Sequence, residues 1–208
     1  MKKLLFRLFS LSYLLFLGSC GSSDNQFELI GNADVSDGTM IYVLQADQNN
    51  QPYIKDSTSV QSNSFKFKGI SSTPQISYIQ VQGVNGYVLA ILENGDIKAD
   101  IYKDSISKSK VYGTKSNDDF IKYKSETKSL VDVMNNISSD AQNAIMSGDV
   151  VTAMELEKEY NSKEREVMLY EWDFIVDNLD SYMSALLLEV FMIENKVNKD
   201  NSMDNMLA

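Results

Sequence analysis

The hydrophobic pattern of the chain changes its period once, near Gly113, and this change limits the folds open to it. Before that point apolar and polar residues alternate in short runs, a pattern that predicts β-strands. After it apolar residues recur every three or four positions, which predicts amphipathic helices. We therefore expect an α+β protein, with an N-terminal antiparallel β-sandwich or barrel-like lobe followed by a C-terminal three-helix segment.

Short alternating runs predict the β lobe over residues 27–113. Phe65 and Phe67 alternate with Lys66 and Lys68, which is typical of a half-buried strand. Asn94-Gly95 separates two apolar runs, and this dipeptide favours a two-residue turn. The sequence therefore predicts a hairpin at that position.

The helical segment is predicted over residues 116–195. One apolar seam extends from Phe120 to Ala144 and a second from Ala153 to Phe174, and only Ser147-Gly148-Asp149 and a few further residues separate them. A short connection between two long amphipathic helices implies an antiparallel hairpin.

A third helix is predicted from Asp180 or Ser181 to Ile193, and it is apolar around most of its circumference. Such a helix must be buried on more than one side. Either the β lobe covers it, or it forms an interface with a partner or a second copy. The residues expected at that interface form one stripe: Met183, Leu186, Leu187, Val190 and Phe191.

The first 20 residues have the form of a lipoprotein signal peptide. Lys2, Lys3 and Arg7 precede an apolar run that is too short to span a bilayer, and Leu17-Gly18-Ser19-Cys20 resembles a bacterial lipobox. We expect Cys20 to become the lipidated first residue, with its acyl chains anchoring the protein to the membrane. A polar tether, residues 21–26, follows it, and a flexible tail is expected over residues 196–208.

Composition excludes several classes of function. The chain carries a net charge of −10, and removing residues 1–20 takes away three positive charges and no negative ones, which leaves −13. An acidic chain is a poor nucleic-acid binder. The sequence contains no histidine, and Cys20 is its only cysteine, so histidine-based triads, His metal sites and dithiol chemistry are excluded. We predict no enzyme activity, no cofactor and no metal.

Three groups of polar or aromatic residues are candidate sites, and a structural role is favoured for each. Asp56-Ser57-Thr58 is expected to be part of a strand, because no histidine is present to activate a hydroxyl. Glu93 and Asp96 flank a predicted turn, where polar residues are common. The four tyrosines of the β lobe could offer a ligand platform, but cross-strand packing is the preferred interpretation: Tyr42, Tyr53, Tyr78 and Tyr87.

Asp118 and Asp119 could contribute to a calcium site. The surrounding loop lacks the alternating ligand spacing of calcium-binding loops. Compensation of the helix dipole at a helix N-terminus explains both residues more simply.

Several short segments, in order, resemble a known family. They are Phe27-x-Leu29-x-Gly31, Asp56-Ser57-Thr58, Phe65-x-Phe67-x-Gly69, Leu92-Glu93-Asn94-Gly95-Asp96-Ile97, Val111-Tyr112-Gly113 and Asn178-x-Asp180-Ser181. The pattern is similar to the N-terminal domain of unknown function of thioredoxin-like (TlpA/AhpC-type) lipoproteins of two-membrane bacteria. The resemblance implies an envelope location, but no Cys-x-x-Cys pair is present to carry redox activity.

These observations lead us to expect a lipid-anchored, non-catalytic binding or scaffolding protein of the cell envelope, at the outer membrane and facing the periplasm. Its expected partners are the membrane, through Cys20, and a second copy or an envelope protein. The alternative is a truncated or accessory component of a thioredoxin-like thiol-disulfide oxidoreductase system. A glycan- or peptide-binding module is a third hypothesis.

Replacing Cys20 with Ala should abolish incorporation of labelled fatty acid and release the protein from the membrane fraction, because the acyl chains can no longer be attached. A Ser22→Ala variant is the control and should be labelled like the wild type. A Cys20→Ala protein that still takes up fatty acid would contradict the anchor hypothesis.

Overall fold

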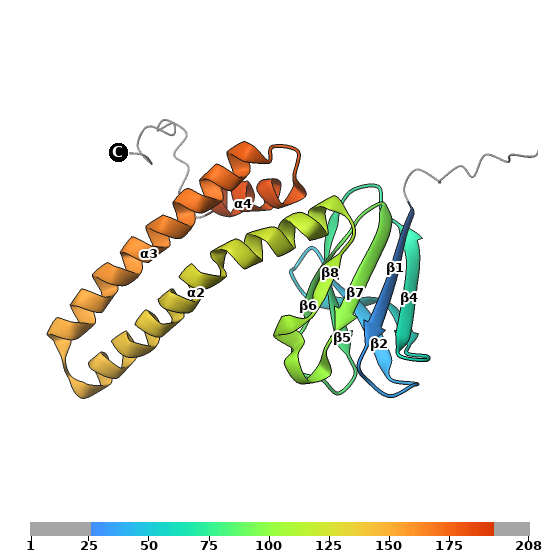
Figure 1. Cartoon of the computed structure of the whole chain (residues 1–208), viewed down its shortest axis with the longest axis horizontal. Coiled ribbons are helices and arrows are strands. Elements are labelled where there is room, and N and C mark those ends of the chain that lie inside the picture. Colours follow the sequence, from blue (N-terminus) through green and yellow to red (C-terminus); the bar gives the residue numbers. More distant parts are fainter. Residues whose placement is uncertain (1–25, 194–208) are drawn as a thin grey trace, which may run out of the picture.

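The computed structural model describes residues 26–193, which form a β lobe and a helical arm (Figure 1). The expected signal peptide with Cys20, residues 21–25 of the expected tether and residues 194–208 lie outside the described residues. Among the described residues no helix is both long enough and apolar enough to cross a membrane.

The β lobe is a sandwich of two four-stranded sheets. Sheet A has the order β4-β1-β7-β8 and sheet B the order β3-β2-β5-β6. Sheet A comprises β1 (Gln26–Ala33), β4 (Ser64–Ile70), β7 (Gly95–Ile101) and β8 (Lys110–Tyr112). Sheet B comprises β2 (Met40–Ala46), β3 (Pro52–Ser59), β5 (Gln75–Val81) and β6 (Val88–Leu92). The predicted α+β class and its antiparallel β lobe are confirmed, and one pair within the lobe, β1 with β7, is parallel.

The predicted Asn94-Gly95 hairpin is wrong. Strand β6 pairs with β5, whereas β7 pairs with β1 and β8, so the turn at residues 93–94 carries the chain from sheet B to sheet A. Gly95 has a φ of 120°, the positive value that glycine adopts at low cost. The local turn signal was therefore correct, but the pairing partner of β7 was already set by the more distant β1.

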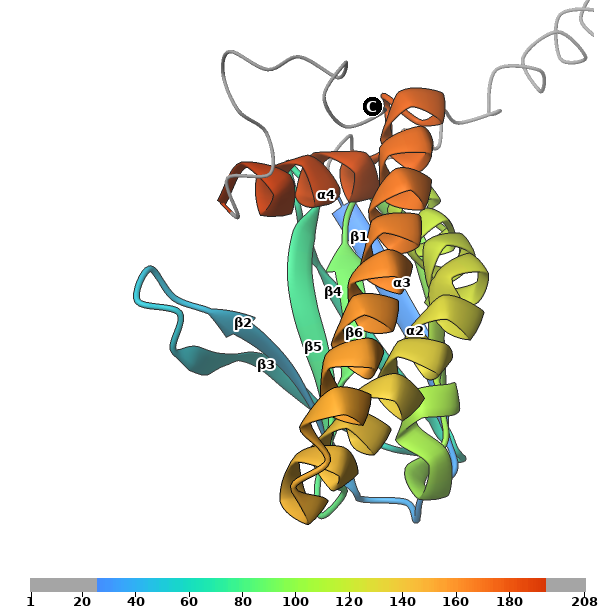
Figure 2. The same cartoon turned by 90° about the vertical axis from the view of Figure 1, so that its left-hand side faces the viewer.

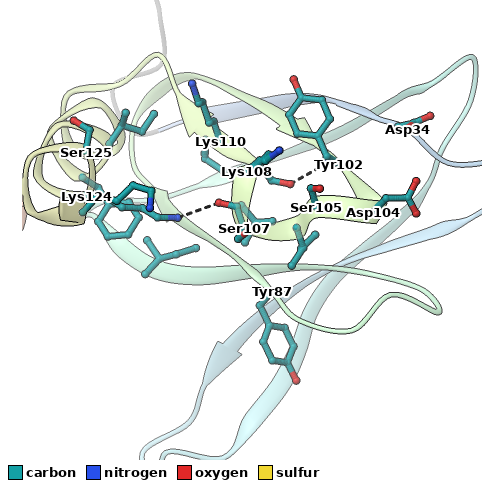
Figure 3. Close-up of a pocket in the computed structure, with 18 residues that line it drawn as sticks. Asp34, Tyr87, Tyr102, Asp104, Ser105, Ser107, Lys108, Lys110, Lys124 and Ser125 are labelled. Carbon is teal, nitrogen blue, oxygen red and sulfur yellow. Dashed lines mark hydrogen bonds between the residues drawn. The ribbon is translucent and has the colours of Figure 1, made fainter. Parts of the chain in front are cut away.

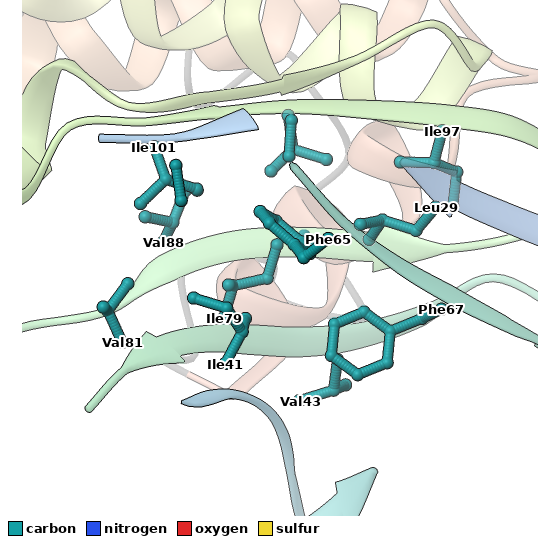
Figure 4. Packing of buried hydrophobic residues seen from close by; sticks show 14 of the residues in the cluster. Leu29, Ile41, Val43, Phe65, Phe67, Ile79, Val81, Val88, Ile97 and Ile101 are labelled. Carbon is teal, nitrogen blue, oxygen red and sulfur yellow. The ribbon is translucent and has the colours of Figure 1, made fainter. Parts of the chain in front are cut away.

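The inward faces of the two sheets form the main core (Figure 4). Alternate residues of each strand point inward, and Leu29, Ile41, Ile79 and Ile97 are wholly buried. Gly31 lies inside β1, and the Phe65 ring of the paired strand β4 packs over it. A Cβ at this glycine would lie 2.1 Å from that ring, so the absence of a side chain makes room for the aromatic residue.

The segment 103–112, at the end of the predicted β lobe, is folded. It contains a short 3₁₀ helix, η2 (Lys103–Lys108), and the edge strand β8. The helices α2 (Lys115–Ser147) and α3 (Val150–Asp177) then form the predicted antiparallel hairpin, which extends away from the sandwich (Figure 1). Figure 2 shows the β2–β3 hairpin projecting from the rest of the sheet.

The third helix, α4 (Tyr182–Ile193), crosses the base of this hairpin and completes a second core. Trp172 packs against Phe191, with ring centroids 6.2 Å apart. Three residues of the expected interface stripe, Met183, Leu187 and Phe191, are buried in this core.

The stripe on α4 is therefore corrected. Leu186 also packs against the second core, and of the five expected interface residues only Val190 is exposed. The reason is the turn before α4: the Asn178 side chain donates to the Phe174 carbonyl at 2.8 Å, and Ser184 Oγ donates to the Asn178 carbonyl at 2.7 Å. These bonds hold α4 against the hairpin, so its apolar stripe is used within the chain.

Truncating Phe191 to Ala should lower the free energy of unfolding by about 3–5 kcal/mol, because a fully buried aromatic ring is replaced by a cavity. The neighbouring Met192→Ala is the matched control, since Met192 is exposed on the same helix. Chemical denaturation measures both. Equal destabilisation by the two substitutions would contradict the internal placement of α4.

Candidate functional site

The attachment of α2 to the β lobe depends on the buried side chain of Asn117. The Ile91 N–H donates to Asn117 Oδ1 at 2.9 Å, and Asn117 Nδ2 donates to the Ile91 carbonyl at 2.8 Å and to Thr114 Oγ1 at 2.8 Å. Strand β6 is an edge strand, so its outer backbone groups have no neighbouring strand to pair with. The amide of Asn117 takes the place of that strand.

Glu93 holds the first turn of the same helix. Its carboxylate accepts hydrogen bonds from the Ser116 N–H at 2.8 Å and from Ser116 Oγ at 2.6 Å. The first N–H groups of a helix have no partner within the helix, so a carboxylate at this position satisfies them and the helix dipole together. The negative charge of Glu93 is thus used in joining the two lobes.

The candidate carboxylates have structural roles. Asp96 is exposed on β7, while Glu93 is engaged with Ser116, so the two are not arranged as a catalytic pair. Asp118 accepts from the Gly113 N–H at 2.9 Å, and Asp119 forms an ion pair with Lys115 at 3.1 Å. These contacts match the expected helix N-terminal role. Among the described residues, no group of three or more acidic, His or Cys side chains could hold a metal ion.

Asp56, Ser57 and Thr58 lie on β3, paired with β2, as expected for a strand segment. Asp56 accepts from the N–H of Ser57 at 2.7 Å. The Tyr53 hydroxyl donates to Gln45 Oε1 at 3.1 Å, as part of a polar cluster that also includes Lys55 and Ser77. These residues stabilise the projecting β2–β3 hairpin.

The remaining tyrosines lie on the outer face of sheet B. The strand registers align one outward side chain from each strand into a row: Ile54, Leu44, Tyr78 and Leu89. Tyr78 and Tyr87 pack edge to face with ring centroids 6.2 Å apart, which is the expected aromatic packing. Tyr87 is 57% exposed, and the outer face of this sheet is therefore partly apolar and open to solvent.

A groove of about 920 Å³ lies between η2, β6 and the first turns of α2. Its apolar lining includes Leu89, Ile106, Phe120 and Ile121. Four lysines also line it: Lys108, Lys110, Lys124 and Lys128. Tyr87 and Leu89 connect it to the apolar row on sheet B. We call it the lysine groove (Figure 3).

Three of the four lysines have a positive charge that no acidic residue of the described chain pairs with. Lys128 forms an ion pair with Asp132, but Lys108, Lys110 and Lys124 form none among residues 26–193. Lys124 donates to the Ser107 carbonyl at 3.4 Å, which holds α2 near η2 (Figure 3). Asp34 and Asp104 are the acidic residues of the lining. The groove is thus positive within an acidic protein.

Sequence reasoning missed the groove although the signal was present. Residues 103–128 contain seven lysines and four acidic residues, a local charge of +3 in a chain whose net charge is −10. Because η2, β8 and the start of α2 are consecutive, this segment folds into one wall of the groove. Leu89 and Tyr87 come from a separate part of the sequence, and only the sheet topology places them opposite the lysines.

Two half-buried tyrosines, Tyr123 and Tyr170, lie at the base of the hairpin. The Tyr123 hydroxyl donates to Glu171 at 2.5 Å, and the Tyr170 hydroxyl donates to Glu126. Burial, with the neighbouring carboxylates, raises the pKa of both tyrosines far above the usual value, so both hydroxyls stay protonated and act as donors. They link α2 to α3 beside the second core.

The described residues thus form an α+β protein, in which a β-sandwich is joined to a helical arm and an apolar and basic groove lies at the junction. Residues 27–120 match the model of a family described as a domain of unknown function (DUF4369). This confirms the resemblance found in the sequence. The matched region extends past the strands to Phe120, so it includes Glu93, Asn117 and the first turn of α2. No curated protein and no solved structure matches the chain.

Replacing Asn117 with Ala should lower the free energy of unfolding by about 2–4 kcal/mol, because the buried N–H and carbonyl of Ile91 lose their partner. Asn136→Ala, on an exposed part of the same helix, is the control and should leave stability unchanged or slightly raised. Thermal unfolding followed by circular dichroism measures both. An Asn117→Ala protein as stable as the control would contradict this role.

Proposed function

We propose that the protein is a lipid-anchored, non-catalytic binding or scaffolding protein of the cell envelope, and that the lysine groove is its binding site. The observation that carries this proposal is the composition of the groove: an apolar lining, with Leu89, Ile106, Phe120 and Ile121, beside three lysines that have no acidic partner among residues 26–193. The volume of about 920 Å³ is in the range of known ligand sites.

The chemistry of the groove selects its ligand. An apolar lining favours apolar surface, and free lysines favour a negative charge beside it. A ligand with only one of these properties leaves the other part of the groove unmatched. The groove therefore suits an apolar segment or molecule that carries carboxylates, and nothing in this role requires a reacting group.

The proposed attachment through Cys20 is compatible with this site. The tether leads into Gln26, the first residue of β1, whereas Asp34 of the groove lining lies just beyond the other end of that strand. Binding at the groove and attachment at the N-terminus would therefore use different ends of the β lobe.

A dansyl-labelled undecanoate carboxylate should bind the lipid-free protein beginning at Gly21, and its uncharged methyl ester should bind more weakly. Replacing Lys110 and Lys124 together with Glu should weaken carboxylate binding about tenfold, because two attractive charges become repulsive. Lys158→Glu, on the distant part of α3, is the control. Fluorescence titration gives the dissociation constants. Equal affinity of the wild type and the double variant would contradict the proposed site.

A further inference from the structure

The closed end of the α2–α3 hairpin carries an exposed apolar cluster. Its five side chains are 55% to 78% exposed, and we call them the tip patch: Ile145, Met146, Val150, Val151 and Met154. The patch continues into an apolar groove of about 540 Å³ between the two helices, lined by Ile137, Ala153 and Leu156 among others. A contiguous exposed apolar surface of this kind marks an interaction site.

Within residues 26–193, no third element covers the distal half of the hairpin. The buried clusters of the described chain lie inside the sandwich and at the hairpin base, where α4 packs. Beyond that base α2 and α3 pack against each other (Figure 1), and two helices alone cannot enclose an apolar face. Two hairpins side by side can do so, as in a four-helix bundle.

The tip of the hairpin and the lysine groove carry opposite charges. Residues 140–159, around the tip, contain five acidic residues and one lysine, a local charge of −4. The lysine groove at the other end lies in the segment of charge +3. Both surfaces are apolar, and the charges around them have opposite signs. The tip of one copy therefore complements the groove of another in apolar surface and in charge.

One helix carries both surfaces. Lys124 of the groove and Met146 of the tip lie on α2, 22 residues apart, which corresponds to about 33 Å along the helix. In two antiparallel copies each tip lies opposite the groove of the other, and a single two-fold axis satisfies both contacts. The net charge of the chain opposes association, so the pairing depends on these two ends.

We propose that the lysine groove binds the tip patch of a second copy of this chain, in a reciprocal antiparallel dimer. The inference rests on the proposed function, because it names the partner of the proposed binding site. It moves self-association from the stripe on α4, which is used internally, to the exposed end of the hairpin.

The test uses the full-length chain in cells, where Cys20 is the only native cysteine. Met146→Cys combined with Lys108→Cys should form a disulfide-linked dimer that reductant dissolves, since both side chains are exposed and face each other across the proposed contact. Met146→Cys alone should not, because the antiparallel dimer places the two tips far apart. Met146→Cys with Lys66→Cys, on the distant strand β4, is the matched control.

Charge exchange then tests recognition. Adding Lys110→Glu and Lys124→Glu should lower the yield of dimer about tenfold, and adding Glu155→Lys and Glu157→Lys to that variant should restore it. A misfolded protein would not be restored by changes at the opposite end of the hairpin.

Any one of three results would overturn the proposed dimer. These are equal cross-linking of the Lys66 control pair, absence of the Met146–Lys108 dimer, and no rescue by the charge exchange. Carboxylate binding distinguishes this result from failure of the proposed function. If the carboxylate binds and no dimer forms, the groove is a binding site for another partner. If the dimer forms and the carboxylate does not bind, the groove serves self-association and not ligand binding.

Discussion

The pairing of the Asn117 amide with the backbone of Ile91 is the interaction on which the arrangement of the two lobes depends. It satisfies the outer edge of β6 and fixes the first turn of α2 at the same point. Glu93 adds a second attachment through Ser116, in the turn that carries the chain between the sheets. This junction sets how the hairpin leaves the sandwich and places the start of α2 as a wall of the lysine groove.

The sequence predicted the elements well because their signals are local. The apolar seams of α2 and α3 and the turn at Gly148 follow from helical spacing and glycine chemistry, and both helices formed as expected. The pairing of strands is a non-local property, and there the prediction was wrong. Asn94-Gly95 does form a turn, but β7 pairs with β1, which precedes it by more than 60 residues.

The site was harder to predict than the fold. Asn117 belongs to a polar helix start, and nothing in that pattern distinguishes an amide that replaces a strand from an ordinary capping residue. The α4 stripe was identified correctly as apolar, but its partner could not be inferred: the fold of the turn at Asn178 decides whether Phe191 faces the chain or a partner. The lysines of the groove form a charge cluster that is visible in the sequence. The sequence does not show that Tyr87 and Leu89 are their apolar neighbours.

Helix caps on both sides fix the turn at the tip of the hairpin. Gly148 has a φ of 76° and ends α2, and Asp149 begins α3 by accepting from the Thr152 N–H at 3.1 Å and from Thr152 Oγ1 at 2.8 Å. These bonds lower the pKa of Asp149, which therefore remains ionised and capping at neutral pH. A capped, short turn presents Met146 and Val150 in a fixed arrangement rather than letting the ends of the helices fray. Such an arrangement lowers the entropy lost on binding, and it explains how an exposed apolar tip can serve recognition.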